Sequence, residues 1–168
     1  MKLLIFADTH NSPFHMLEVV GEETGVHAVI HLGDGFRDAE ILQQKYPHLP
    51  VYSVCGNCDL ACLGPEEGLI PFGGLLLYYT HGHIQGVKQE YTTLWRTAKK
   101  RGADIALFGH THMPYHKYNG GIHLFNPGSL NMPRSGRGSY GTLVIENGRP
   151  EFDFCGYHSE KPLIIQEE

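Results

Sequence analysis

The sequence has no long apolar run, and this limits where the protein can act. Near the start of the chain, the apolar stretch Leu3 to Ala7 is five residues long and ends at the acidic Asp8. A membrane-spanning helix needs about 20 apolar residues, and the core of a signal peptide needs about 7 to 15. We therefore expect a cytoplasmic protein with no membrane partner.

Cysteine is also scarce. Three of the four cysteines are clustered at Cys55, Cys58 and Cys62, and Cys155 is far away, which is a poor disulfide framework. Cys55 and Cys58 have the spacing of a redox motif, but the glycine- and proline-rich stretch 64–68 argues against the helix that such a motif opens. We expect all four thiols to be reduced and no redox chemistry at this pair.

The chain has no long run of one charge sign, and only 18% of its residues are charged. It has 13 Lys and Arg against 18 Asp and Glu, a formal net charge of −5. This excludes a protein that holds nucleic acid through net positive charge, so we expect no stable nucleic-acid complex. Nucleic acid stays open as a substrate.

Repeats, low-complexity segments and linkers are absent from the sequence as well. A chain of 168 residues, 41% of them hydrophobic, can bury about two-thirds of its unfolded surface around one core. We therefore expect a single domain over residues 1–168. What the chain has in plenty is histidine, with 12 residues. Because imidazole is the commonest metal ligand and a proton carrier near pH 7, the positions of these histidines matter most.

Short apolar runs alternate with amphipathic stretches and glycine-rich joints. The first half of the chain predicts strands at 3–7, 26–32 and 51–55 and helices at 14–23 and 38–46. The second half predicts strands at 69–72, 75–80 and 104–108, a helix at 89–100, and hairpin turns at 119–121 and 147–148. The βαβαβ order of the first half favours parallel strands, and hairpins favour antiparallel ones. We therefore predict an α/β protein whose halves share one core, built on a mixed sheet or a pair of sheets.

Polar side chains follow five of the predicted strands at the point where each strand ends. In chain order they are Asp8 and His10, Asp34, Asn57, His81 and His83, and His110 and His112. Because sites gather at the carboxyl ends of parallel strands, we expect these residues to share one pocket. Carboxylate, amide and imidazole donors without a thiolate suit Mn²⁺, Fe, Ni²⁺ or Zn²⁺ better than Ca²⁺.

Each of these residues has a simpler explanation when it is taken alone. Asp8 could cap the helix that follows, Asp34 could serve only the turn in Gly-Asp-Gly, and each histidine could lie in a loop as a hydrogen-bonded ring. Their joint placement at strand ends favours a shared metal site over these alternatives.

The motifs together resemble those of a known family. The series Asp8-x-His10, Gly33-Asp34, Gly56-Asn57, His81-Gly82-His83 and Gly109-His110-x-His112 is similar to the calcineurin-like metallophosphoesterase superfamily. The short chain, Asn57-Cys58-Asp59 and Asn126-Pro127-Gly128-Ser129 resemble its small prokaryotic phosphodiesterase branch, to which the retromer subunit of the same fold is also similar. The resemblance implies a four-layer α/β/β/α sandwich of two mixed β-sheets flanked by helices.

The resemblance also implies a centre with two divalent metal ions. One ion would be held by Asp8, His10, Asp34 and His112, and the other by Asp34, Asn57, His81 and His110, with Asp34 bridging. We expect manganese first, with nickel, zinc, iron or magnesium as alternatives. The implied activity is hydrolysis of a small phosphodiester by a hydroxide that bridges the two metals. The alternative is a protein-interaction scaffold of the same fold with weak or no catalysis, and the chain could form a homo-oligomer in either case.

The sequence departs from the family at one position close to the chemistry. Many members have histidine after the motif asparagine, where it is thought to protonate the leaving group, but this chain has Cys58. A thiol with a pKa near 8.5 is a less well matched general acid. The catalytic candidates are therefore Asn57, Cys58 and His83. Arg134 and Arg137 either meet a substrate phosphate or keep a loop soluble. Gly128 and Ser129 either shape the loop that closes the pocket or form a simple turn.

Overall fold

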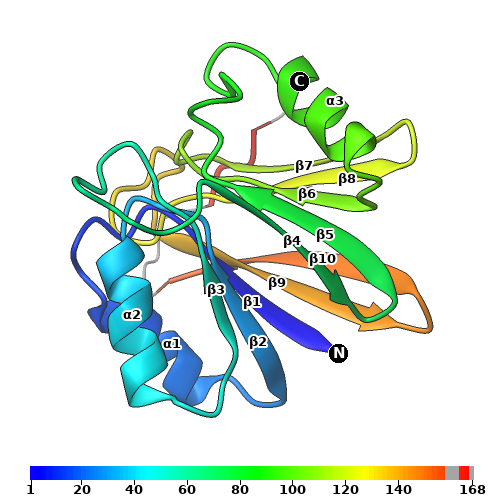
Figure 1. Ribbon diagram of the computed structural model, residues 1–168. Helices are drawn as coiled ribbons and strands as arrows, with labels where there is room; N and C mark the ends of the chain where they lie inside the picture. The colour runs from blue at the N-terminus through cyan, green and yellow to red at the C-terminus, as the bar shows by residue number, and fades with distance from the viewer. Residues whose placement is uncertain (158–162, 167–168) are drawn as a thin grey trace.

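The computed structural model describes residues 1–157 and 163–166. Two five-stranded sheets pack face to face, and helices cover their outer faces, as Figure 1 shows. The predicted α/β/β/α sandwich of two mixed sheets is confirmed.

In the described residues, no helix is long and apolar enough to cross a membrane. The single domain, the cytoplasmic location and the homo-oligomer stay predictions.

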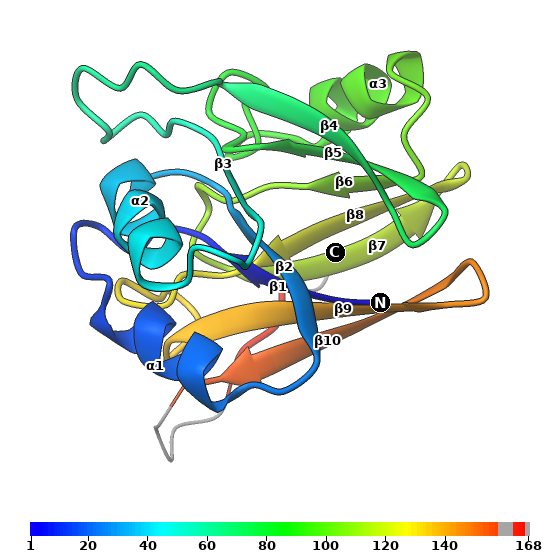
Figure 2. The same cartoon turned by 60° about the horizontal axis from the view of Figure 1, so that its bottom comes forward.

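The first sheet has the strand order β10-β9-β1-β2-β3. Its strands are β1 (Lys2–Phe6), β2 (Val26–His31), β3 (Val51–Ser53), β9 (Ser139–Glu146) and β10 (Arg149–Gly156). The first three are parallel, as the βαβαβ order predicts, whereas β9 runs antiparallel to β1 and β10. Helices α1 (Phe14–Glu22) and α2 (Phe36–Lys45) connect the parallel strands and lie on the outer face of this sheet, as Figure 2 shows.

The second sheet has the strand order β4-β5-β6-β8-β7. Its strands are β4 (Glu67–Phe72), β5 (Leu75–Thr80), β6 (Ile105–Leu107), β7 (Pro114–Asn119) and β8 (Ile122–Pro127). Strands β5, β6 and β8 are parallel, and the hairpins β4–β5 and β7–β8 supply the antiparallel pairs. Helix α3 (Thr92–Lys100) covers the outer face. It begins three residues later than predicted, because turns occupy the segment before it.

Strand β1 packs buried side chains on both of its faces. Leu3 and Ile5 point into the cluster between the two sheets, whereas Leu4 and Phe6 pack against Met16 of α1. All of these side chains are fully buried. A strand that is buried on both faces reads as a continuous apolar run, which is the pattern that the sequence shows at this position.

The expectation that every cysteine is reduced is wrong. Cys55 and Cys62 form a disulfide across a Cα–Cα distance of 6.0 Å, whereas Cys58 and Cys155 are free. Strand β3 ends at Ser53, and tight turns then fold the chain back, with the N–H of Cys62 donating to the carbonyl of Asp59 at 3.2 Å. This reversal brings Cys62 next to Cys55, and no residue pattern indicated it.

Candidate metal centre

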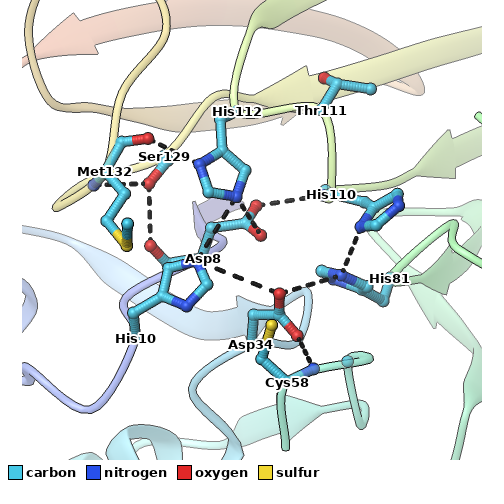
Figure 3. Close-up of polar contacts among 12 residues, drawn as sticks. Asp8, His10, Asp34, Cys58, His81, His110, Thr111, His112, Ser129 and Met132 are labelled. Carbon is cyan, nitrogen blue, oxygen red and sulfur yellow. Dashed lines mark hydrogen bonds and ion pairs between the residues drawn. The ribbon is translucent and has the colours of Figure 1, made fainter. Parts of the chain in front are cut away.

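The predicted site residues come together although they span more than a hundred positions of the sequence. They follow β1, β2, β3, β5 and β6, and loops of both sheets meet at this edge of the sandwich. Figure 3 shows the side chains of Asp8, His10, Asp34, His81, His110 and His112 pointing toward one another. The structure therefore brings these six side chains together at one edge of the sandwich.

A first group of donors consists of Asp8, His10, Asp34 and His112, whose donor atoms all lie within 4.8 Å of one another. Nε2 of His112 lies 3.1 Å from Oδ1 of Asp8 and 3.4 Å from Nε2 of His10. Nε2 of His10 lies 4.0 Å from Oδ2 of Asp34. Two carboxylates and two imidazoles thus surround one small volume.

A second group consists of Asp34, His81 and His110. Nε2 of His81 lies 3.5 Å from Oδ2 of Asp34 and 3.1 Å from Nδ1 of His110. Oδ1 of Asn57 lies 3.1 Å from the same His81 nitrogen. Asp34 belongs to both groups, which is the position that a bridging carboxylate would take.

The backbone of most donor residues has a left-handed conformation. Five non-glycine donors have a positive φ: Asp8 (56°), His10 (49°), Asp34 (52°), His110 (68°) and His112 (62°). Side chains disfavour this left-handed region, and residues held there cluster at functional sites because the surrounding structure has to impose the conformation.

Backbone hydrogen bonds hold the strained loops in place. The N–H of Asp8 donates to the carbonyl of Gly33 at 3.0 Å, and the N–H of His10 donates to the carbonyl of Asp34 at 2.8 Å. These bonds tie the loop after β1 to the loop after β2. The backbones that carry Asp8 and Asp34 are therefore held in a fixed relation to each other.

Two histidine rings are oriented by backbone carbonyls. Nδ1 of His81 lies 2.7 Å from the carbonyl of Leu32, and Nδ1 of His112 lies 2.6 Å from the carbonyl of Met132. A carbonyl only accepts, so each Nδ1 carries the proton. In the neutral ring, Nε2 then presents a lone pair to the centre, which is the tautomer that a metal-ligating histidine needs.

Two observations show that the donors fit metal ions. Oδ1 of Asp8 is buried and accepts no hydrogen bond among the described residues, although an unpartnered buried carboxylate oxygen is costly. In their neutral forms, the rings of His81 and His112 also aim the lone pairs of Nε2 at the centre. A cation satisfies both features, and carboxylate with imidazole is a donor set for Mn²⁺, Fe or Zn²⁺.

The pKa shifts of Asp34 and His110 agree with this fit, whereas the carboxylates of Asp34 and Asp8 outweigh burial and raise the pKa of His81 and His112. Burial alone would raise the pKa of Asp34, but its contacts with His81 and the N–H of Cys58 outweigh burial and hold the pKa far below its usual range. Burial, together with the charge of His81, lowers the pKa of His110 to about 4. An ionised carboxylate and a neutral imidazole are the forms that bind metal.

Three further residues, of which only Ser129 was a candidate from the sequence, support the loops of the site. Asn126 donates through Nδ2 to the carbonyl of Gly109 at 2.8 Å. Ser129 donates through Oγ to the carbonyl of Asp8 at 2.8 Å. Asn131 donates through Nδ2 to the carbonyl of Thr9 at 2.7 Å. Ser129 therefore shapes the site, as one of the two alternatives for it proposed.

Asp59 links the loops after β2 and β3. Its Oδ1 accepts from the N–H groups of Gly35 and Phe36 at 2.9 and 3.0 Å, at the beginning of α2. Its Oδ2 accepts from the N–H of Gly56 at 2.8 Å. The sequence offers no periodic signal for long-range contacts of the kind that Asp59 makes.

The alternative that Asp8 caps α1 is wrong, because that helix has no side-chain cap.

The remaining catalytic candidates lie at the rim. Cys58 is exposed, and its Sγ lies 3.3 Å from Nδ2 of Asn57. Burial of the thiol and the nearby Asp34 raise its pKa to about 11, so it stays protonated at neutral pH. The ring of His83 lies 5.3 Å from the ring of His81, outside both donor groups, and its buried Nδ1 has no hydrogen-bond partner among the described residues.

Several known proteins are similar to this chain in sequence. Residues 1–148 match the model of the calcineurin-like phosphoesterase superfamily domain. The chain belongs to this superfamily. It is 35% identical over 150 residues to the probable metallophosphoesterase YsnB of Bacillus subtilis, covering 88% of this chain and 86% of YsnB. It is 28% identical over 172 residues to the phosphodiesterase YfcE of Escherichia coli K12, covering 85% of this chain and 87% of YfcE.

Solved structures agree with this family. A predicted phosphoesterase of Streptococcus pneumoniae superposes with a TM-score of 0.81 at 28% identity, over 92% of this chain and 88% of that one. Vps29 of Entamoeba histolytica superposes with a TM-score of 0.72 at 22% identity, over 94% of this chain and all of that one. The second likeness shows the fold alone. The resemblance inferred from the motifs is confirmed, and the chain is a member of a family of metal-dependent hydrolases of phosphoester bonds.

Proposed function

We propose that the protein is a phosphodiesterase that works with two divalent metal ions, manganese first. The observation that carries this proposal is the pair of donor groups that share Asp34. The relative YfcE, which is named a phosphodiesterase, supports the choice of a diester over a monoester. A small phosphodiester is the proposed substrate.

The donor residues and the groups that orient them have different roles at this centre. Two divalent ions would lower the pKa of a coordinated water and stabilise charge that develops on the phosphoryl oxygens. Asp8 and Asp34 neutralise only part of that positive charge, so an anionic diester can bind although the whole chain is acidic. The carbonyls of Leu32 and Met132 keep His81 and His112 in the ligating tautomer. Asn57 adds an amide oxygen beside His81.

The leaving group needs a proton donor, and two side chains stand near enough to act. His83 lies beside the second donor group, but burial lowers the pKa of its ring, so it is a neutral imidazole at neutral pH. Cys58 is exposed and next to Asn57, but a neutral thiol gives up its proton poorly. Neither side chain is a strong acid at neutral pH, so we propose that esters with a good leaving group react faster than alkyl esters.

One feature favours the rival function, a protein-interaction scaffold. Leu60 is 91% exposed and Leu63 is fully exposed, and both line a pocket of about 700 Å³ that Cys58 also lines. Exposed apolar side chains next to a site are typical of contact surfaces. The complete donor set argues for the enzyme, since a scaffold has no need of His10, Asn57 or His81.

A matrix of metals and substrates separates the two functions. The protein is stripped of metal, reloaded with Mn²⁺, Ni²⁺, Zn²⁺ or Mg²⁺, and assayed with aryl phosphomonoesters and aryl phosphodiesters in parallel. The phosphodiesterase proposal expects at least one metal, Mn²⁺ first, to restore hydrolysis of the diester above that of the monoester. Hydrolysis of neither substrate with any metal would leave the scaffold as the better account.

A further inference from the structure

A second cavity lies on the outer face of the second sheet, apart from the donor groups. It has a volume of about 820 Å³ and lies between the segment that leads into α3 and strand β7. We call it the basic groove. Its cationic lining residues are Lys88, Arg96, Lys117 and Arg134, and its aromatic ones are Tyr91, Trp95 and Tyr115.

The charge of the groove is opposite to that of the chain. Among the described residues, four of the 13 Lys and Arg residues of the chain line it, and Glu90 is the single acidic one. The side chains of Lys88, Arg96 and Arg134 are exposed and form no ion pair with the described residues. In a protein with a formal charge of −5, this local excess of unpaired cations favours an anionic ligand.

The groove and the metal centre share two loops. Thr111 lines the groove and stands between His110 and His112, with its side chain turned away from the donors in Figure 3. The N–H of Arg134 donates to the carbonyl of His112 at 3.1 Å. A substrate whose reacting phosphate lies at the donors can therefore continue over this loop into the groove.

Two partly exposed aromatic rings, those of Tyr91 and Trp95, line the groove with the cations, whereas Tyr115 is buried. Tyr91 and Tyr115 pack against each other with ring centroids 4.4 Å apart, and Trp95 is anchored by its Nε1–H on the carbonyl of Asn119 at 2.9 Å. A groove that combines backbone-tracking cations with rings suits single-stranded nucleic acid, because phosphates meet the cations and bases stack on the rings. An acidic peptide would use the cations but not the rings.

We propose that the basic groove binds the nucleotides of a short single-stranded oligonucleotide whose reacting phosphodiester lies at the metal centre. This inference rests on the proposed phosphodiesterase function, and it narrows the substrate to a diester that carries bases and further phosphates. Binding is weak and salt-dependent, since only a few local cations hold the strand. It does not require the stable nucleic-acid complex that the net charge argues against.

The test measures binding without turnover. The probe is a phosphorothioate hexathymidylate, which keeps the charge of each linkage but resists hydrolysis. Trp95 is the one tryptophan of the chain, so quenching of its emission reports occupation of the groove. The variant Lys88→Gln/Arg96→Gln is compared with the control Lys45→Gln/Lys100→Gln, which removes the same charge at exposed positions outside the groove.

We expect the groove variant to bind the oligonucleotide at least about tenfold more weakly than the wild type. The slope of the logarithm of the binding constant against the logarithm of the salt concentration should become shallower by about 1.4, because each of the two lost cations contributes about 0.7. The control variant should bind like the wild type. Arg134→Gln, made separately, should also weaken binding. Equal weakening by the control, or hexaglutamate binding as tightly as the oligonucleotide, would overturn the proposal, and so would the absence of any binding to the wild type.

Hydrolysis of a small aryl phosphodiester by the wild type is assayed beside these measurements. If the aryl diester is hydrolysed but the groove variant binds the oligonucleotide normally, the groove proposal fails and the phosphodiesterase proposal stands. If the oligonucleotide binds in the groove but no diester is hydrolysed, the phosphodiesterase proposal fails and the groove remains a nucleotide-binding site.

Discussion

The backbone N–H of Cys58 donates a hydrogen bond of 2.7 Å to Oδ1 of Asp34. This bond fixes one oxygen of the carboxylate to the loop that carries Asn57. The other oxygen, Oδ2, lies 4.0 Å from Nε2 of His10 and 3.5 Å from Nε2 of His81. One carboxylate oxygen therefore faces both donor groups, and the loop after β3 holds it there.

The side chain of Cys58 makes a different contribution from its backbone. Cys58→His should bring an imidazole to the rim and raise the rate of alkyl phosphodiester hydrolysis relative to aryl phosphodiester hydrolysis, because an imidazole donates a proton to a poor leaving group better than a neutral thiol does. Brønsted plots of kcat/KM against the pKa of the leaving group measure this. Cys58→Ser serves as the control and should keep the steep dependence of the wild type. A flat dependence in the wild type would contradict the proposal.

Asn126 should matter through the loop that it holds. Its buried side chain bonds the carbonyl of Gly109, the Oγ1 of Thr111 and the N–H of Gly128. Asn126→Ala leaves buried groups without partners and should lower the free energy of unfolding by about 2 to 4 kcal/mol. It should also weaken metal binding, because Gly109 precedes His110.

Urea unfolding measures the free energy of unfolding of Asn126→Ala, and titration with Mn²⁺ measures its metal affinity. Gln44→Ala, which removes an exposed amide from α2, is the control and should change neither value. Unchanged metal affinity in a destabilised Asn126→Ala variant would show that the loop needs no support from this side chain.

The disulfide between Cys55 and Cys62 closes the segment that contains Asn57. Reduction by a dithiol should lower the free energy of unfolding by about 2 to 3 kcal/mol, the chain-entropy value for a loop of about eight residues. Urea unfolding with and without dithiothreitol measures it. The double variant Cys55→Ser/Cys62→Ser should be insensitive to the reductant. If the wild type is equally insensitive, the disulfide does not stabilise the fold.

A histidine pair far from the metal centre should make the fold sensitive to acid. Nε2 of His116 lies 3.1 Å from Nδ1 of His123, and burial lowers the pKa of both, with the charge of His123 adding to the effect on His116. The unfolded chain, with ordinary histidine pKa values near 6.5, then binds more protons than the folded one below that pH. Stability is therefore retained above about pH 6.5 and lost as the pH falls through the lowered pKa values.

The measurement is the urea midpoint at pH 7.5 and at pH 5.0. His116→Gln should reduce the loss of stability between the two pH values. His48→Gln, at an exposed position, should leave the loss as it is in the wild type. If both variants lose as much stability as the wild type, the pair does not titrate as described.

The parts of this fold that follow from the sequence are those with a local cause. The buried run of β1 and the order of strands and helices predict the parallel half of the first sheet. The polar residues at strand ends then predict the donors, because the carboxyl ends of parallel strands meet at one edge.

The parts that do not follow depend on contacts between distant segments. Asp59 bonds α2 from a loop more than twenty residues away, and Cys62 reaches Cys55 through turns that carry no periodic pattern. The positive φ of His110 and His112 is imposed by surrounding bonds, since nothing in the histidine side chain prefers it. The basic groove likewise joins α3 to β7, and no single segment contains enough of its cations to indicate it.

The central claim is that Asp34 joins two metal ions in one hydrolytic centre. The most direct test counts the metal ions bound per chain by mass spectrometry, after loading with Mn²⁺ and desalting, in the wild type and in Asp34→Asn. Asp153→Asn, which removes a carboxylate on β10, is the control. The account predicts two ions per chain and diester hydrolysis in both the wild type and the control. In Asp34→Asn it predicts at most one ion per chain and no more than about a hundredth of the wild-type activity, because a bridging ligand is lost. Two ions and full hydrolysis in Asp34→Asn would contradict it.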